Sequence, residues 1–155
     1  MGEDDWRARC VDAYPAVYRA VIAMGASANE AADAVQDAYE KALLQGRSLE
    51  RPEGWLFVVA LRRFRADRWR HRIFRPLSSL RVAVPDNARP ERVDLLAAIA
   101  MLPQRQREVL IARYVIGLSQ VETAQLLRIA TGTVAATTSH ATKSLRDRLG
   151  EGYGR

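Results

Sequence analysis

The chain has 155 residues, 48% of them hydrophobic, and carries a formal net charge of +6 at pH 7 with a pI near 10.1. This length accommodates one ordinary domain or two small ones, and the positive charge favours an anionic partner such as nucleic acid. One cysteine and two histidines exclude an internal disulfide and provide no metal cluster and no arrangement of nucleophile, base and orienting group. We therefore expect neither a cofactor nor enzymatic activity.

Arginine dominates the basic residues, because Lys41 and Lys143 are the only lysines among 24 cations. Arginine binds phosphate and guanine edges bidentately, which suits contact with DNA, although a GC-rich coding sequence explains the bias equally well. The N-terminus is acidic, and no apolar run approaches the roughly 18 residues that a membrane span requires. We expect a cytoplasmic protein without membrane insertion.

The first helix is expected over residues 6–24, followed by Gly25 as a helix-ending residue. Pro15 lies inside this segment and marks either an interruption or the first turn of a helix that begins near Tyr14. Helical spacing places five apolar residues roughly on one face: Trp6, Cys10, Val17, Val21 and Met24.

The second helix is expected over residues 28–45, because Ser27 and Glu30 have the spacing of a capping box. Its buried face comprises Ala31, Val35, Ala38, Tyr39 and Ala42. Its outward face is an acidic stripe made of Asp33, Gln36, Asp37 and Glu40. The stripe fits a docking face for a basic partner protein, and it equally fits a solvated face whose acids suit the helix dipole.

The third helix follows Pro52 and changes character halfway along its length. Residues 3–53 carry ten acids and six cations, a balance of −4, whereas residues 54–75 carry seven arginines against Asp67 alone, a balance of +6. Phe64, Trp69 and Phe74 are interleaved with these arginines, a mixture that is typical of surfaces that hold a nucleic-acid backbone and stack bases. The alternative is that the aromatic side chains are core and the arginines form a solvated face.

Residues 76–92 lose the helical period and contain three prolines, which predicts a linker. A second helical unit follows, with helices over residues 93–101 and 104–115 separated by Leu102 and Pro103. Val109, Leu110 and Tyr114 are expected on the apolar face of the second of these helices. Residues 150–155 are expected to form a frayed tail.

A helix-turn-helix is predicted between Leu118 and Leu145. A capping-box spacing at Ser119 and Glu122 begins its first helix, whose apolar face comprises Val121, Ala124, Leu126 and Leu127. Residues 128–130 fit the turn, and Gly132 opens a second helix whose core stripe is Val134, Thr138, Ala141 and Leu145. The opposite face could enter a major groove, and it comprises Ala135, Ala136, Ser139, His140 and Lys143. A plain helical hairpin has the same periodicity.

Three segments carry a resemblance to a known family. They are DAVQDAYEKA at 33–42, PEGWLFVVA at 52–60 with the arginine-rich helix after it, and LPQRQREVLIARYVIGLSQVETAQLLRIATGTV at 102–134. In this order and at these separations, they resemble the extracytoplasmic-function sigma factors, the small alternative sigma subunits of bacterial RNA polymerase. The resemblance covers nearly all of residues 10–149.

The resemblance implies an all-α chain of two small helical domains joined by a flexible linker. Residues 1–75 would form a region 2-like domain that docks on the polymerase and melts the minus 10 element. Residues 76–92 would be the linker, and residues 93–150 a region 4-like helix-turn-helix domain for the minus 35 element, followed by a tail at 151–155. The implied function is to bind core RNA polymerase, direct it to specific promoters and help open the DNA.

The resemblance also implies roles for individual residues. The face that binds the polymerase would be Asp33, Gln36, Asp37 and Glu40. The minus 10 and melting surface would comprise Arg62, Arg63, Arg65, Arg68, Trp69, Arg70 and Arg72. The minus 35 surface would comprise Arg128, Thr131, Thr133, Ala135, Ala136, Ser139, His140 and Lys143. The implied partners are core RNA polymerase, promoter DNA and an anti-sigma factor, and the free chain is expected to be a monomer.

The chain departs from the family pattern at several of these positions. Arg62 and Arg63 stand near the usual asparagine of the melting helix, and Ala135 and Thr137 stand where the recognition helix often has basic residues. Fewer phosphate contacts predict an unusual minus 35 preference or a stronger dependence on the polymerase. Two other functions fit the pattern: a stand-alone helix-turn-helix regulator, which would act as a dimer, and a sigma-like interaction module that does not start transcription.

Overall fold

The computed structural model describes residues 3–45, 49–74, 95 and 97–150, and it is helical throughout these ranges apart from turns. The predicted all-α class with two domains is therefore confirmed. The predicted linker at 76–92 and the tail at 151–155 lie outside the described residues. No described helix is long and apolar enough to cross a membrane.

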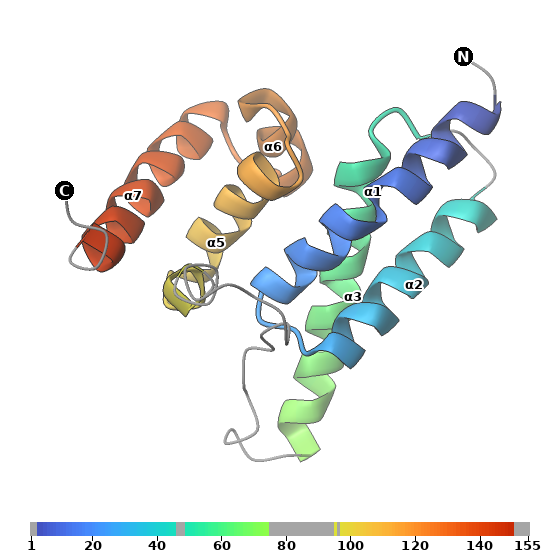
Figure 1. The fold of residues 1–155 in the computed structure, drawn as a ribbon, viewed down its shortest axis with the longest axis horizontal. Coiled ribbons are helices and arrows are strands. Elements are labelled where there is room, and N and C mark those ends of the chain that lie inside the picture. Colours follow the sequence, from blue (N-terminus) through green and yellow to red (C-terminus); the bar gives the residue numbers. More distant parts are fainter. Residues whose placement is uncertain (1–2, 46–48, 75–94, 96, 151–155) are drawn as a thin grey trace.

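The N-terminal domain is a bundle of three helices, α1 (Glu3–Ala23), α2 (Ala28–Leu44) and α3 (Pro52–Phe74), which pack on one another in pairs (Figure 1). The first helix begins three residues before the predicted start, and Pro15 lies within it. Its predicted apolar face is buried, as are the predicted core positions of α2 apart from the partly buried Tyr39. The side chains that fill the centre of the bundle include Val17, Val35, Leu56 and Phe57, all fully buried.

The C-terminal domain comprises α5 (Gln104–Leu110), the π-helical turn η2 (Ile111–Val115), α6 (Gln120–Leu127) and α7 (Thr131–Gly150). Residues 97–100 are helical and end in a turn at Met101, as predicted for this segment. The predicted helix over 104–115 is continuous, but its second half is a π-helix, in which the N–H of Ile116 donates to the carbonyl of Ile111 at 3.0 Å.

Two predictions about apolar faces in this domain are wrong. Tyr114 is 67% exposed and Val121 is 55% exposed, although both were assigned to the buried side. The wider π turn rotates the residues of η2 relative to an α-helix, which explains the position of Tyr114. Val121 lies in the first turn of α6, on nearly the opposite side of the helix from the buried Thr123.

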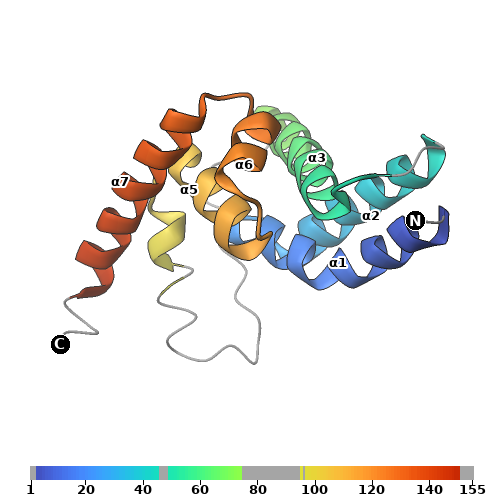
Figure 2. The ribbon, with the colours of Figure 1, turned by 90° about the horizontal axis from the view of Figure 1, so that it is seen from above.

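The two domains pack against each other instead of standing apart. Ile111, Ala112, Ile116 and Leu118 belong to the same buried cluster as the core of α1, α2 and α3. In both views α5 and α6 lie between α7 and the N-terminal bundle (Figures 1 and 2). The described structure is therefore a closed arrangement, which we call the compact form.

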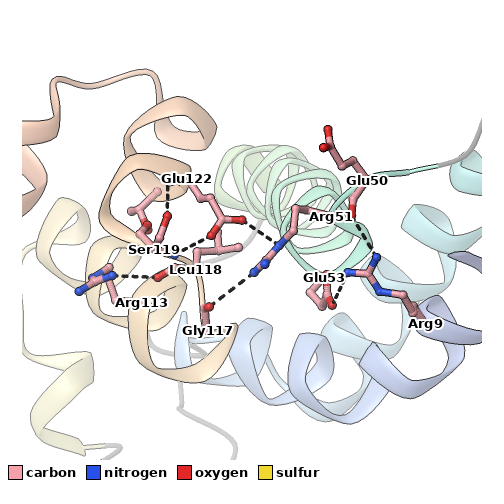
Figure 3. Close-up of polar contacts among 10 residues, drawn as sticks. Arg9, Glu50, Arg51, Glu53, Arg113, Gly117, Leu118, Ser119 and Glu122 are labelled. Carbon is pink, nitrogen blue, oxygen red and sulfur yellow. Dashed lines mark hydrogen bonds and ion pairs between the residues drawn. The ribbon is translucent and has the colours of Figure 1, made fainter. Parts of the chain in front are cut away.

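The two domains approach each other closely at Gly54, near the start of α3. A Cβ atom there would lie 3.3 Å from Cδ2 of Leu118 and 3.5 Å from Cδ2 of Leu126. Beside it, Nε of Arg51 lies 2.8 Å from the Glu122 carboxylate (Figure 3). An apolar contact and an ion pair therefore hold α3 to α6.

Substitution of Gly54 should separate the domains in proportion to side-chain size. Gly54→Leu cannot fit against Leu118, so we expect a larger radius of gyration by small-angle X-ray scattering, with unchanged helix content. Gly54→Ala should stay compact, because Leu118 has to move only a few tenths of an ångström and alanine favours the helix by about 1 kcal/mol. An unchanged radius for the leucine variant would contradict the compact form.

Candidate nucleic-acid and polymerase interface

The helix-turn-helix is built by local hydrogen bonds that the sequence predicts. The Ser119 hydroxyl accepts from the Glu122 N–H at 3.0 Å, and the Glu122 carboxylate accepts from the Ser119 N–H at 3.0 Å. These bonds lower the pKa of Glu122, against the opposing effect of burial, and Arg51 adds to the lowering. Arg128 then ends α6 in the left-handed conformation at φ 57°. The turn sends α7 away from α6.

The two faces of α7 lie as predicted. Val134 and Ala141 are fully buried, and Thr138 and Leu145 are half-buried. The predicted minus 35 residues are all exposed: Arg128, Thr131, Thr133, Ala135, Ala136, Ser139, His140 and Lys143. Because α7 lies on the side of the C-terminal domain away from α1, α2 and α3, the compact form leaves this helix accessible (Figure 2).

The acidic stripe on α2 is only partly free. Asp33, Gln36 and Glu40 are exposed, as predicted. Asp37 was expected to point outward as well, but its side chain is 17% exposed and lies 3.0 Å from both Arg63 and Lys41. The expectation of a free Asp37 is corrected, because the positive charge of α3 recruits this carboxylate across the bundle.

The arginines of α3 divide into an exposed group and a group bound within the fold. Arg62 and Arg70 are exposed, and so is the neighbouring Trp69, at 66%. Arg70 lies 3.6 Å from Asp67, and the side chain of Arg72 lies outside the described residues. A surface of cations and one aromatic ring therefore remains open from the middle of α3 towards its C-terminal end.

The other α3 arginines bind acids and carbonyls within the fold. Arg63 pairs with Asp67 at 2.9 Å and with Asp37 at 3.0 Å. The two carboxylates stabilise the charged guanidinium, so the pKa of Arg63 is raised, mainly by Asp67. Arg68 donates to the Gly25 carbonyl at 2.6 Å and lies 3.5 Å from the Glu30 carboxylate.

Arg65 differs from Arg63 because its partner belongs to the other domain. It pairs with Glu108, a carboxylate of α5 that is 4% exposed. This pair joins the two domains, so a residue predicted to touch DNA is held by the other domain in the compact form.

Sequence reasoning missed Glu108, Arg51 and Arg107. Arg51 spans the domains to Glu122 and to the Gly117 carbonyl (Figure 3). Arg107 donates to the Met24 carbonyl at 3.4 Å. The partners are 71, 66 and 83 positions away in the chain, so no local spacing marks them. The signal that was present is a glutamate among apolar neighbours in the segment REVLIA at 107–112.

The comparisons with known proteins agree with this geometry. Residues 92–145 match the family model described as Sigma-70, region 4. The chain is similar to the sigma factor RpoE in complex with the anti-sigma factor NepR from Bartonella quintana, at 24% identity over 94% of this chain and 96% of that chain, with a TM-score of 0.75. It is also similar to CnrH in complex with the cytosolic domain of CnrY, at 25% identity over 96% of this chain and 90% of that chain, with a TM-score of 0.67.

Residues 92–145 belong to the family of sigma-70 region 4 domains, and the chain shares its overall fold with the sigma factor RpoE. The resemblance to extracytoplasmic-function sigma factors is thereby supported in this domain and in the fold. No curated protein matches the chain in sequence. The family match covers α5, η2, α6 and most of α7, which is the part that contains the helix-turn-helix.

Loss of the buried carboxylate of Glu108 should destabilise this protein. Glu108→Gln leaves Arg65 without its counter-charge, and hydrogen bonds to charged groups contribute about 1.5–3 kcal/mol. Because the Arg65 side chain is 37% exposed, we expect a loss near the lower end, about 1.5 kcal/mol, in urea unfolding. Glu50→Gln, at an exposed position, should change the free energy of unfolding by less than about 0.5 kcal/mol. Equal losses for the two variants would contradict the role of Glu108.

Proposed function

We propose that this sigma factor binds core RNA polymerase, directs it to specific promoters and helps to open the DNA. One observation carries the proposal: the exposed face of α7 is presented by a capped helix-turn-helix in the segment that matches sigma-70 region 4. A helix with small and polar outward side chains can lie deep in the major groove.

The rest of the described surface supports the same function. The open surface of α3 combines Arg62 and Arg70 with the exposed ring of Trp69. This combination suits single-stranded DNA, because bases stack on aromatic rings and phosphates pair with cations. The exposed acids Asp33 and Glu40 offer a basic partner a complementary surface. We assign this surface to the polymerase and the α3 surface to the minus 10 element.

An anti-sigma factor is the proposed regulator of the chain. One similar structure is a sigma factor in complex with the anti-sigma factor NepR. The similarity spans nearly all of both chains, which supports a partner of this kind for the present chain.

The docking surface can be tested by charge reversal in run-off transcription with core RNA polymerase on fragmented genomic DNA. Asp33→Arg and Glu40→Arg should each reduce discrete transcripts by about tenfold, because they set like charges against a basic partner. Asp37→Arg is unsuitable, since it also breaks the ion pairs with Arg63 and Lys41. Asp12→Arg, an exposed reversal on α1, is the matched control and should retain transcription.

Three results would contradict the docking assignment or the function itself. Full transcription by both reversed variants would move docking elsewhere. Co-purification of the wild type with core enzyme without any start site would support the interaction module. Tight duplex binding in the absence of polymerase, by a dimer, would support the stand-alone regulator.

The recognition face can be tested by adding a negative charge to α7. Ala136→Glu should lower transcription by about tenfold at promoters with an upstream element, because a carboxylate meets bases and phosphates there. On templates truncated just upstream of the minus 10 element, the variant and the wild type should give equal transcription. Val11→Glu, at a site on α1 that is 70% exposed, should match the wild type on both templates. An equal deficit of Ala136→Glu on both templates would contradict recognition by this face.

A further inference from the structure

A cavity of about 270 Å³ lies where the two domains meet. The end of α1, the middle of α3 and the start of α5 form its walls, and its polar lining includes Arg65, Arg68, Gln104 and Arg107. Trp69 adds an exposed aromatic ring. The site therefore exists only in the compact form, because α3 and α5 belong to different domains.

The cavity contains three guanidinium groups but no carboxylate in its lining. Glu108, which is not part of the lining, forms an ion pair with Arg65, and the Glu30 carboxylate lies 3.5 Å from Arg68. Arg107 forms no ion pair with any carboxylate that the structure describes, and its hydrogen-bond acceptor is the Met24 carbonyl at 3.4 Å. The local charge is therefore positive and incompletely balanced.

Arg107 is the least satisfied of the three arginines. Its Nε atom is buried and has no hydrogen-bond partner among the described residues. Burial lowers the pKa of Arg107, and the positive charges of Arg65 and Arg68 lower it further, against the opposing charge of Glu108. A Cβ on Gly25 would lie 3.9 Å from Nη1 of Arg68 and 3.9 Å from Nη1 of Arg107, so both guanidinium groups converge on one turn. An anion bound here would reduce the repulsion between the two guanidinium groups and could accept a hydrogen bond from the Nε of Arg107.

We propose that this cavity binds a small phosphoryl anion of the diphosphate type. Planar guanidinium groups donate paired hydrogen bonds to phosphoryl oxygens, and a diphosphate offers enough oxygens and charge for three of them. A volume of about 270 Å³ lies just below the roughly 300–1,000 Å³ of pockets for drug-sized ligands, which favours a small anion. Trp69 at the rim offers a stacking surface if a base is attached to the phosphates.

Binding has a consequence for the arrangement of the domains. A ligand that contacts walls from both domains stabilises the compact form by mass action, and in this form Arg65 and Arg68 stay engaged within the fold. The anion site does not depend on the proposed function, because it requires only the described geometry.

Binding is tested by titrating the full chain with inorganic pyrophosphate and with ADP at constant ionic strength, followed by calorimetry and by tryptophan fluorescence. A third titration uses a single-stranded thymidine oligonucleotide, which separates a free diphosphate from the phosphates of a DNA backbone. The test variant is Arg107→Gln, and the matched control is Arg148→Gln, which removes the same charge from an exposed site near the end of α7.

We expect saturable one-site binding of pyrophosphate to the wild type and to Arg148→Gln, and affinity lower by about tenfold or more in Arg107→Gln, since a charge-assisted hydrogen bond is lost. The fluorescence response should vanish in Trp69→Phe while the calorimetric affinity persists. Circular dichroism checks the fold of each variant. If Arg107→Gln loses helix content, Arg107→Lys replaces it as the test variant, because lysine keeps the charge and removes the buried Nε donor. The same loss of pyrophosphate affinity is then expected for Arg107→Lys.

Two results would overturn the proposal. Either pyrophosphate and ADP fail to bind the wild type, or Arg107→Gln and Arg148→Gln weaken binding equally, as expected for general attraction to a basic surface. If the oligonucleotide alone depends on Arg107 while pyrophosphate and ADP do not bind, the cavity belongs to a DNA strand and the free-diphosphate site is rejected.

Discussion

Helix α3 carries more positive charge than its own sequence balances, and the arrangement of the molecule depends on acids from other helices. Two ion pairs hold α3 against α2: Arg63 binds Asp37, and Arg68 binds Glu30. Glu108 of α5 meets Arg65, which fixes the C-terminal domain against the first. Because Glu108 is almost fully buried, its charge requires close cations. Arg105 of the same helix lies 3.1 Å away, and Arg65 supplies a second cation across the domain contact, so this pair favours the compact form.

This arrangement leaves the two proposed DNA surfaces in different states. The recognition face of α7 is exposed in the compact form, whereas three α3 arginines, Arg63, Arg65 and Arg68, are engaged in contacts inside the protein. Opening the domains would free Arg65 only by exposing Glu108 and the apolar surfaces of Ile111 and Leu118. Under the proposed function, engagement of α3 with DNA would be coupled to the contact between the domains, whereas engagement of α7 would not.

Local structure could be predicted from the sequence, since its causes are local. The capping boxes at Ser27 and Ser119 each join residues three positions apart, and both are present. The burial of Val134 and Ala141 follows from helical phase alone. Tyr114 was misplaced because nothing in the segment marks a π turn, and Asp37 was misplaced because its partner Arg63 lies 26 residues away. The pair of Arg65 and Glu108 spans 43 residues and required the packing of the two domains to be known.

The composition of α7 constrains how promoter contact is shared between the domains. Ala135 and Ala136 can approach thymine methyl groups closely, but their side chains cannot bind a phosphate. Among the predicted recognition residues that lie within α7, Lys143 is the exposed cation. Few phosphate contacts mean weak attraction to DNA by α7 alone. Under the proposed function, the larger share of promoter affinity would then fall to the arginines of α3 and to the polymerase, so the state of the domain contact would decide promoter engagement.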